Sequence, residues 1–178
     1  GSIRFVGEGF RLNCHDFFIG RVNNPIKIVW SRELPSKPSS CTVSLNPSGQ
    51  WFVSFICEEE INILPKIDKK IGVDLGIKSF ATLSDGTKIK QPDSVRKMRR
   101  KLARAQRSHS RKKIDSKNKE RARIETARIS QKIVNIRNDF QQKLSTQLIR
   151  ENQTIVIENL TVSGMLKKGS HNLARSIS

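Results

Sequence analysis

Residues 70–86 read KIGVDLGIKSFATLSDG, and the alternation in their first half predicts a β-strand with two different faces. Apolar side chains at positions 71, 73, 75 and 77 belong to one face, whereas Gly72, Asp74 and Gly76 belong to the other. Aspartate is disfavoured in strands, and an ionised carboxylate near a core is costly unless a cation or hydrogen-bond donors meet it. Asp74 therefore indicates a ligand on this open face, either a metal ion or a metal bound to phosphate.

The sequence after this strand predicts a β-meander. Residues 80–83 form a second apolar run, and residues 84–87, Ser-Asp-Gly-Thr, carry the signals of a tight turn. A third short strand is expected to end near Ile89. The strand that holds Asp74 is thus predicted to be the first of three.

The charge of the chain indicates its class of partner. Lys and Arg outnumber Asp and Glu by 34 to 16 in 178 residues, which gives a formal net charge of +18. Such a surplus is typical of a protein that binds a polyanion, and nucleic acid is the leading partner. No apolar run approaches the roughly 20 residues that span a bilayer, and no signal peptide opens the chain, so no membrane partner is expected.

The cysteines indicate a reduced, cytoplasmic protein. Cys14, Cys41 and Cys57 are odd in number and form no C-x-x-C pair, which favours neither a disulfide framework nor a zinc site. We interpret all three as buried thiols.

Residues 1–66 predict an antiparallel β region. Apolar or alternating runs at 26–30, 41–45 and 51–56 have the character of short strands, and the turn Asn-Pro-Ser-Gly at 46–49 joins the last two as a hairpin. Segments 10–14 and 17–20 add further strands. Aromatic side chains on alternating strands are more often core than stacking platforms for bases, and we interpret four of them as core: Trp30, Trp51, Phe52 and Phe55. Residues 61–69 are expected to be a linker.

Residues 92–151 predict a helical hairpin. Pro-Asp-Ser at 92–94 fits a helix N-terminus, and apolar residues then recur at steps of three and four. A break at 108–118 separates two helices. The expected apolar stripes are Val95, Met98, Leu102 and Ala105 on the first helix, and Ile129, Ile133, Ile136, Phe140, Leu144 and Leu148 on the second.

The positive charge is concentrated in this hairpin. Between Arg96 and Arg150 there are 19 Lys and Arg residues against 4 Asp and Glu residues. Solvated helices ordinarily mix both signs, so this surplus favours contact with a phosphate backbone over a merely solvated face. The expected contact residues are Arg99, Arg100, Arg104, Arg107, Arg111, Lys112 and Lys113.

A second carboxylate follows the hairpin. Residues 155–157, Ile-Val-Ile, are typical of a buried strand, and this strand ends on Glu158. If it lies parallel beside the strand of Asp74, with the hairpin as crossover, the two carboxylates meet at the carboxyl ends of neighbouring strands. Two carboxylates at such a short distance repel each other unless a divalent cation lies between them. Mg²⁺ prefers oxygen ligands of this kind. Asp74 and Glu158 are therefore predicted to bind a metal.

Residues 71–86 resemble the first RuvC motif of the TnpB (OrfB) proteins of bacterial insertion sequences, which are relatives of the type V CRISPR nucleases. Residues 155–160, with 162–166 and 172–178 after them, resemble the second motif and the helix that follows it. The basic hairpin also fits the family, and the N-terminal strands resemble the end of its wedge-type, oligonucleotide-binding-like barrel.

The resemblance implies a fold of the α+β or α/β class. Residues 67–178 would form part of a ribonuclease H-like (RuvC) mixed sheet with the basic hairpin at 92–151 as an insert, and residues 1–66 would belong to the wedge-type barrel. It also implies a transposon-encoded DNA endonuclease of a bacterial or archaeal cytoplasm, associated with the nucleoid. Its partners would be a transposon-derived guide RNA and a duplex DNA target, with no small-molecule substrate.

The resemblance further implies a site of three carboxylates that hold two Mg²⁺ or Mn²⁺ ions. Asp74 and Glu158 would be the first and second catalytic residues. In the family the third lies beyond a four-cysteine zinc ribbon, and neither occurs before Ser178. The zinc site is expected only in that missing C-terminal part, and the chain alone is expected to be inactive as a nuclease.

Two alternatives remain open. Relatives that have lost their carboxylates are nuclease-inactive, RNA-guided DNA-binding proteins, and this chain by itself could act in that way. Residues 71–76 are also similar to the first phosphate loop of the actin, sugar-kinase and Hsp70 ATPases, although those proteins usually carry a hydroxyl residue where Ile77 stands. A transposase with a tyrosine nucleophile is excluded, because the chain contains no Tyr.

Overall fold

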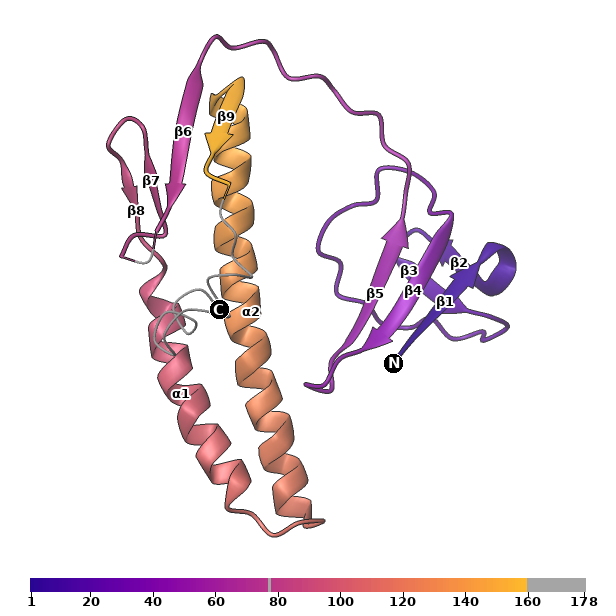
Figure 1. Cartoon of the computed structure of the whole chain (residues 1–178). Helices are drawn as coiled ribbons and strands as arrows, with labels where there is room; N and C mark the ends of the chain where they lie inside the picture. The colour runs from indigo at the N-terminus through magenta and orange to yellow at the C-terminus, as the bar shows by residue number, and fades with distance from the viewer. Residues whose placement is uncertain (77, 160–178) are drawn as a thin grey trace. The chain divides into compact units, whose positions relative to one another are not determined.

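The computed structural model describes residues 1–76 and 78–159, and its strands and helices form an α+β architecture (Figure 1). The chain divides into two units. One consists of Gly1–Ile63 and Arg107–Arg128, and the other of Leu64–Gln106 and the chain from Ile129 onward. The expected continuation of the second motif, at 160–178, and Ile77 lie outside the described residues.

The N-terminal strands form two antiparallel sheets. The first has the order β1-β4-β5, and the second pairs β2 with β3. Their bounds are Ser2–Val6 for β1, Phe10–Asn13 for β2, Asp16–Ile19 for β3, Ser40–Leu45 for β4 and Trp51–Ile56 for β5, with a 3-10 turn at Gly7–Gly9. The hairpin expected from 41–45 and 51–56 is confirmed. β1 was not predicted.

The core of these sheets is aromatic. Phe10, Phe17 and Cys41 are buried together, and the ring of Phe55 packs edge-on to Phe17 with centroids 5.5 Å apart. Burial of the Cys41 thiol away from water raises its pKa, because the thiolate form would lose hydration. Cys14, by contrast, is exposed, so its predicted burial is wrong.

The strand predicted at 26–30 does not form. Ile26 makes only an isolated bridge to Phe17, and Val29 is 94% exposed. The reason lies in Trp30, whose indole N–H donates to the carbonyl of His15 at 3.1 Å and whose ring stacks on Phe55 with centroids 5.5 Å apart. Packing of this one side chain has replaced a ladder of backbone hydrogen bonds.

Two of the four aromatics interpreted as core are exposed. Trp51 is 69% and Phe52 is 46% exposed, whereas Phe55 packs against the core and Trp30 stacks on it. Phe52 pairs with Ser44 and alternates with Val53, so it lies on the outer face of the sheet. Trp51 begins β5 opposite the last residue of β4, where the sheet ends.

The second unit contains a four-stranded mixed sheet of order β8-β7-β6-β9. β6 (Lys70–Leu75) is antiparallel to β7 (Ala81–Leu83), which is antiparallel to β8 (Lys88–Ile89). β9 (Thr154–Ile157) lies parallel to β6, with Lys70 opposite Thr154 and Val73 opposite Ile157. The predicted meander and the predicted parallel neighbour of its first strand are both confirmed.

The turn between β7 and β8 follows from its residues. The Asp85 carboxylate accepts the backbone N–H of Thr87 at 2.9 Å, and this hydrogen bond lowers the pKa of Asp85. Gly86 adopts φ +87°, a left-handed conformation that residues with a Cβ rarely adopt.

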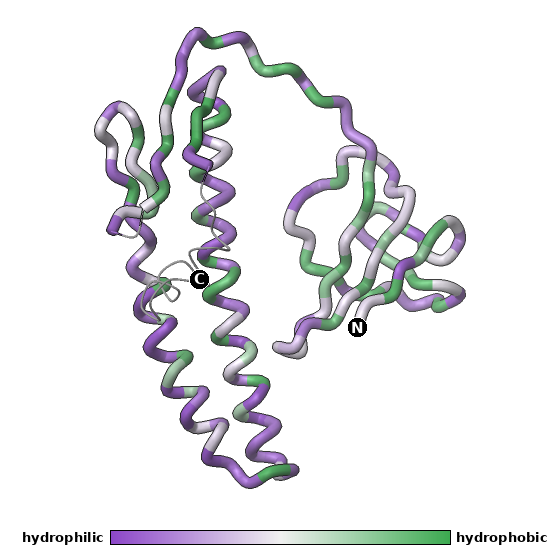
Figure 2. Tube along the Cα trace, in the orientation of Figure 1, coloured by the Kyte–Doolittle hydropathy of each residue, from purple (hydrophilic) through white to green (hydrophobic). Residues whose placement is uncertain are grey.

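Helix α1 (Asp93–Ser110) and helix α2 (Lys117–Glu151) form the hairpin between β8 and β9. The Pro92 carbonyl accepts the Val95 N–H at 3.0 Å where α1 begins, and the Ser116 hydroxyl caps α2 by accepting the Lys119 N–H at 3.1 Å. The break, at 111–116, is shorter than predicted. Along both helices apolar positions recur between hydrophilic ones (Figure 2). No helix among the described residues is apolar over a length that could cross a membrane.

The predicted apolar stripes make two clusters in the second unit. Val95, Ile129 and Ile133 are buried between α1 and α2, with Met98, Leu102, Ala105 and Ile136 packed against them. Further along α2, Leu148 joins Ile71, Val73 and Ala81 under the sheet, and the ring of Phe140 meets that of Phe80 edge-on at 5.0 Å. The helix pair is thereby attached to one face of the sheet.

Truncation of Ile133 tests the helix–helix cluster. Ile133→Ala should lower the free energy of unfolding by about 2 to 5 kcal/mol, because it removes buried methylene groups and leaves a cavity. Urea denaturation followed by helical circular dichroism measures this. Val134→Ala is the matched control: Val134 is 46% exposed on the next position of α2, and its loss should cost less than about 0.5 kcal/mol. Equal effects of the two changes would contradict the packing.

Candidate active site and nucleic-acid interface

The two faces of β6 differ in the way that its alternation predicts. Ile71 and Val73 are buried under the sheet, whereas Asp74 is exposed on the opposite face. Within residues 1–76 and 78–159 the Asp74 carboxylate has no hydrogen-bond or ion-pair partner. Its oxygens are therefore available to a ligand.

The register between β6 and β9 brings the second carboxylate to the same place. Val73 pairs with Ile157, so the next residues along the two parallel strands are Asp74 and Glu158. Residues in register on parallel strands carry their side chains on the same face, and neighbouring strands lie about 4.8 Å apart. Glu158 is also exposed. Two residues separated by the whole helical hairpin are thus neighbours at the carboxyl ends of adjacent strands.

β9 itself is not the buried strand that its apolar run predicted. Val156 is 61% and Ile157 is 66% exposed. In the described part of the chain β9 is the edge strand of its sheet, paired with β6 alone, and this position explains the exposure.

The donor set fits a magnesium ion only in part. No group of three or more His, Cys, Asp or Glu side chains among the described residues could hold a metal. Asp74 and Glu158 are a pair of hard oxygen donors, and Mg²⁺ is commonly held by one or two carboxylates together with substrate phosphates. The pair therefore suits a single Mg²⁺, which would need water and a phosphate as its further ligands.

Side chains of β7 and β8 share the face of the sheet on which Asp74 lies. Thr82 of β7 lies directly opposite Asp74, and Lys88 of β8 lies directly opposite Thr82. Directly opposite residues share a face, so a cation and a hydroxyl stand in one row with the carboxylate. Neither residue was predicted from the sequence. Alternation counted outward from the turn at 84–87 is the signal that would have identified both.

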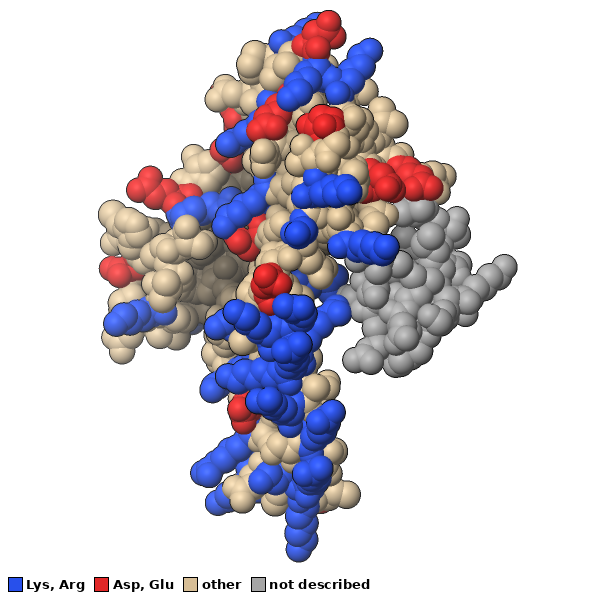
Figure 3. Space-filling model, turned by 90° about the vertical axis from the view of Figure 1, so that its left-hand side faces the viewer, with Lys and Arg blue, Asp and Glu red and all other residues tan. Residues whose placement is uncertain are grey.

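The basic residues lie on the solvent side of the helical hairpin. All seven predicted contact residues are exposed, and Lys and Arg cover much of the narrow part formed by the two helices (Figure 3). On α1, Arg96, Arg100, Arg104 and Arg107 follow one another at steps of four, four and three, opposite the stripe that begins with Val95.

Two acidic residues of α2 are paired within the helix. Glu120 receives two hydrogen bonds from Arg123, which lower the pKa of Glu120, and Asp139 pairs with Lys143 at 2.8 Å. Arg100, Arg104 and Arg107 form no ion pair within the described residues. Each pair of like charges at these spacings destabilises a helix by about 0.2 to 0.5 kcal/mol. These arginines therefore destabilise α1 unless they bind an anion.

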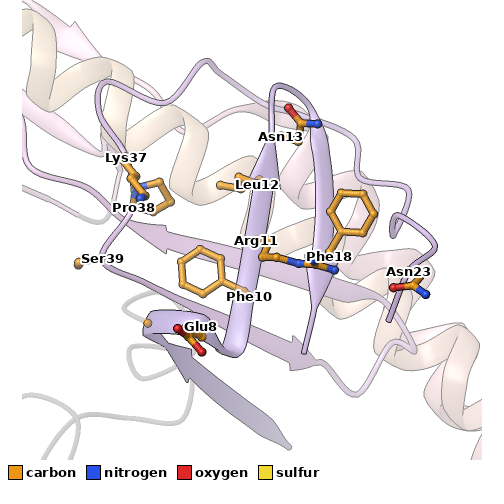
Figure 4. Close-up of a pocket in the computed structure, with 11 residues that line it drawn as sticks. Glu8, Phe10, Arg11, Leu12, Asn13, Phe18, Asn23, Lys37, Pro38 and Ser39 are labelled. Atoms are coloured by element: carbon orange, nitrogen blue, oxygen red, sulfur yellow. The ribbon is translucent and has the colours of Figure 1, made fainter. Parts of the chain in front are cut away.

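A hollow of about 880 Å³ is lined by residues of the N-terminal segment, from Gly7 to Ser39. Figure 4 shows that its lining comes from both faces of β2: Phe10 and Leu12 from one, Arg11 and Asn13 from the other. The Arg11 guanidinium lies 5.4 Å from the Phe18 ring centre and donates to the Val22 carbonyl at 3.4 Å. The hollow follows the free edge of a strand, and we assign no site to it.

Comparison with known families settles the ancestry of the chain. The model of the OrfB_IS605 family, described as "Probable transposase", matches residues 54–169. The chain belongs to the OrfB_IS605 family. The matched range includes the whole meander, the helical hairpin and β9, and it confirms the resemblance to TnpB (OrfB) proteins.

Several relatives carry the same name. A Streptomyces pristinaespiralis protein named "Putative RNA-guided DNA endonuclease" is 47% identical over 179 residues, which cover 99% of this chain and 44% of that protein. InsQ of Escherichia coli K12, named likewise, is 35% identical over 147 residues, covering 82% of this chain and 36% of InsQ. Rv2885c of Mycobacterium tuberculosis is 30% identical over 106 residues. The chain spans less than half the length of each of these relatives.

Proposed function

We propose that this chain supplies two catalytic carboxylates and a nucleic-acid-binding helical hairpin to an RNA-guided DNA endonuclease. The observation that carries the proposal is the parallel pairing of β6 with β9, which makes Asp74 and Glu158 neighbours on an exposed face. The names of the relatives support the reaction class.

The proposal includes the fold of the catalytic part. Three antiparallel strands and a fourth that is parallel to the first, in the order β8-β7-β6-β9, fit the start of a ribonuclease H-like (RuvC) sheet. Residues 67–178 would then be part of that domain with 92–151 as its insert, and residues 1–66 part of a wedge-type barrel.

Asp74 and Glu158 would hold a divalent ion, Mg²⁺ or Mn²⁺, on the DNA strand to be cut. When bound, such an ion activates water and stabilises the charge that develops on a phosphodiester. The residues of this chain position the ion: β6 is fixed from below by Ile71 and Val73, and β9 is fixed by its hydrogen bonds to β6. The family resemblance implies a third carboxylate, which belongs to neither of the two motifs found here.

The helical hairpin would hold nucleic acid through its backbone. Exposed guanidinium and ammonium groups bind phosphates with little preference for sequence, and the released counterions make binding sensitive to salt. The partners would be a transposon-derived guide RNA and the duplex DNA target that it selects. A bacterial or archaeal cytoplasm, close to the nucleoid, is the compartment that these partners imply.

A full-length protein tests the proposal. It can be made by replacing the matching segment of the Streptomyces relative with this chain, since the two are 47% identical. We expect guided cutting of duplex DNA that requires Mg²⁺ and stops when the ion is chelated. The unmodified relative serves as the positive control.

Two results would decide against the proposal. If the relative cuts and the hybrid binds its guided target without cutting, the chain belongs to a nuclease-inactive DNA-binding protein. If the hybrid folds but binds neither RNA nor DNA, the helical hairpin has been misassigned.

A further inference from the structure

One row of side chains crosses the exposed face of the mixed sheet. Lys88 of β8, Thr82 of β7 and Asp74 of β6 are cross-strand neighbours, and the register of β9 continues the row to Glu158. Lys88, Asp74 and Glu158 are exposed and Thr82 is partly exposed. A cation, a hydroxyl and two carboxylates thus follow each other at the spacing of strands, about 4.8 Å.

Beside this row, the exposed face of β6 carries no side chain at Gly72. Gly72 is the next residue on the same face of β6, and Ser84 lies against it: the Gly72 N–H donates to the Ser84 hydroxyl at 3.0 Å, and the Ser84 N–H donates to the Gly72 carbonyl at 2.9 Å. A Cβ added to Gly72 would lie only 3.3 Å from the Ser84 Cβ, so a side chain here would have to displace Ser84 by a few tenths of an ångström. A chain of phosphates could approach the backbone closely here.

The opposite face of the same strands has a different chemistry. Ile71, Val73 and Ala81 are buried there, with Leu83 and Ile89 packed beside them. Every large apolar side chain of β6, β7 and β8 except Leu75 is therefore used for packing under the sheet. The exposed face carries only small or polar groups on these three strands, and on β9 the 61%-exposed Val156 shares this face opposite Gly72. The row from Lys88 to Glu158 is itself polar throughout, which suits a polar ligand that lies along it.

Packing and local ion pairing do not explain Lys88. Two strand spacings separate its backbone from that of Asp74, about 10 Å, and Lys88 forms no ion pair within the described residues. Glu158 follows β9, one strand further from Lys88 than Asp74 is, so Lys88 stands at the far end of the row from both carboxylates. A cation in that position is placed to hold a second anion beside the one that a metal would hold.

We propose that the DNA strand to be cut runs across the strands along this row, with a backbone phosphate held by Lys88 and the reacting phosphate at Asp74 and Glu158. Thr82 lies between them and donates its hydroxyl to a phosphate oxygen or to a bridging water. At an axial rise of about 3.4 Å per nucleotide, the Lys88 phosphate lies within about three nucleotides of the cut. This inference rests on the proposed function of the same site.

Substitution of Lys88 in the full-length protein tests the inference kinetically. Lys88→Gln should raise KM for the DNA target about three- to tenfold and leave kcat within twofold, because a phosphate contact remote from the reacting bond stabilises bound substrate and transition state alike. Lys88→Arg should restore KM. Lys70→Gln is the matched control: Lys70 lies on the same strand face as Asp74 but four residues away along β6, about 13 Å, and should change KM less than twofold.

The position of the contact can be read from the DNA. Neutral methylphosphonates are placed one at a time along the cut strand, and binding is measured with Ca²⁺ in place of Mg²⁺. One linkage within three nucleotides of the cut should weaken binding by the wild-type protein and have no further effect in Lys88→Gln. Identical scans for the two proteins, or an equal effect of Lys70→Gln, would overturn the inference.

A measurement on the 178-residue chain separates this inference from the proposed function, because it needs no cutting. The log–log salt slope for binding single-stranded DNA should become shallower by about 0.7 in Lys88→Gln and remain unchanged in Lys70→Gln. Such a shift would support the contact even if the full-length protein failed to cut. An unchanged slope in Lys88→Gln would refute the contact even if the full-length protein cut normally.

Discussion

Asp74→Asn in the full-length protein is expected to slow Mg²⁺-dependent cutting at least about a thousandfold, and Glu158→Gln to do the same. Metal ligation and charge stabilisation contribute several kcal/mol to such reactions, and each 1.36 kcal/mol is a factor of ten in rate. Both changes keep the size of the side chain while removing its charge. Single-turnover cutting rates measure the effect, together with the Mg²⁺ concentration needed for half of the maximal rate.

Binding and stability should be preserved in the same variants. Asp74 and Glu158 are exposed, and Asp74 has no partner among the described residues, so neither change removes a folded-state interaction there. Asp85→Asn is the matched control, since Asp85 is an exposed carboxylate in the turn between β7 and β8 of the same sheet. The hydrogen bond from the Thr87 N–H lowers the pKa of Asp85 in the folded protein. In the wild-type protein the ionised Asp85 therefore stabilises the fold at pH values above its pKa in the unfolded chain. This contribution is lost as the pH falls through the lower pKa of the folded state. If Asp74→Asn cuts as fast as Asp85→Asn, β6 does not carry the active site.

Reversing four charges of the basic hairpin should lower affinity for RNA and for duplex DNA by orders of magnitude. The variant carries Arg100→Glu, Arg104→Glu, Arg107→Glu and Arg111→Glu. If the wild-type hairpin neutralises about six phosphates, the log–log salt slope on duplex DNA is about −5, and the variant should show a much shallower one. Fluorescence anisotropy across a salt series measures both quantities.

A control with the same change of net charge isolates the hairpin. Arg21, Lys27, Arg32 and Lys37 are exposed in the N-terminal unit, and reversal of these four should weaken binding far less. A single Arg100→Glu adds a second test, because it converts three like-charged pairs on α1, with Arg96, Lys97 and Arg104, into attractive ones. This change should slightly raise the thermal stability of the chain while weakening binding. Equal losses of affinity in the two four-site variants would show that net charge, and not the helical face, attracts the nucleic acid.

Local periodicity predicted most of the mixed sheet and the helices. The alternation of Ile71 and Val73 with Gly72 and Asp74 identified β6 and its two faces, because one side of that strand is packed and the other is exposed. The three- and four-residue recurrence from Val95 identified the helix contact for the same reason. These patterns are local, and each residue type fits the environment that it meets.

Prediction failed where a distant contact determines the structure. Trp30 leaves the expected strand because its indole binds the His15 carbonyl and stacks on Phe55, and nothing in residues 26–30 encodes either partner. Trp51 and β9 were expected to be buried, but burial depends on which strands lie beside them. In the candidate site, Asp74 and Glu158 could be inferred from sequence. Thr82 and Lys88 emerged only with the register of three strands.

The pairing of β6 with β9 also sets the order in which the chain can acquire its site during synthesis. Lys70 and Thr154 are paired although 84 positions separate them, whereas the strands of the meander are joined by short turns. At about 5 to 20 residues per second, a ribosome needs several seconds to deliver β9 after β6 has emerged. In that interval the meander, α1 and the first turns of α2 can form from local contacts, whereas the end of α2 is made just before β9 and Glu158. Under the proposed function, the basic face of α1 would then be able to bind a polyanion before the two carboxylates come together, and nucleic-acid binding would precede any capacity for cutting.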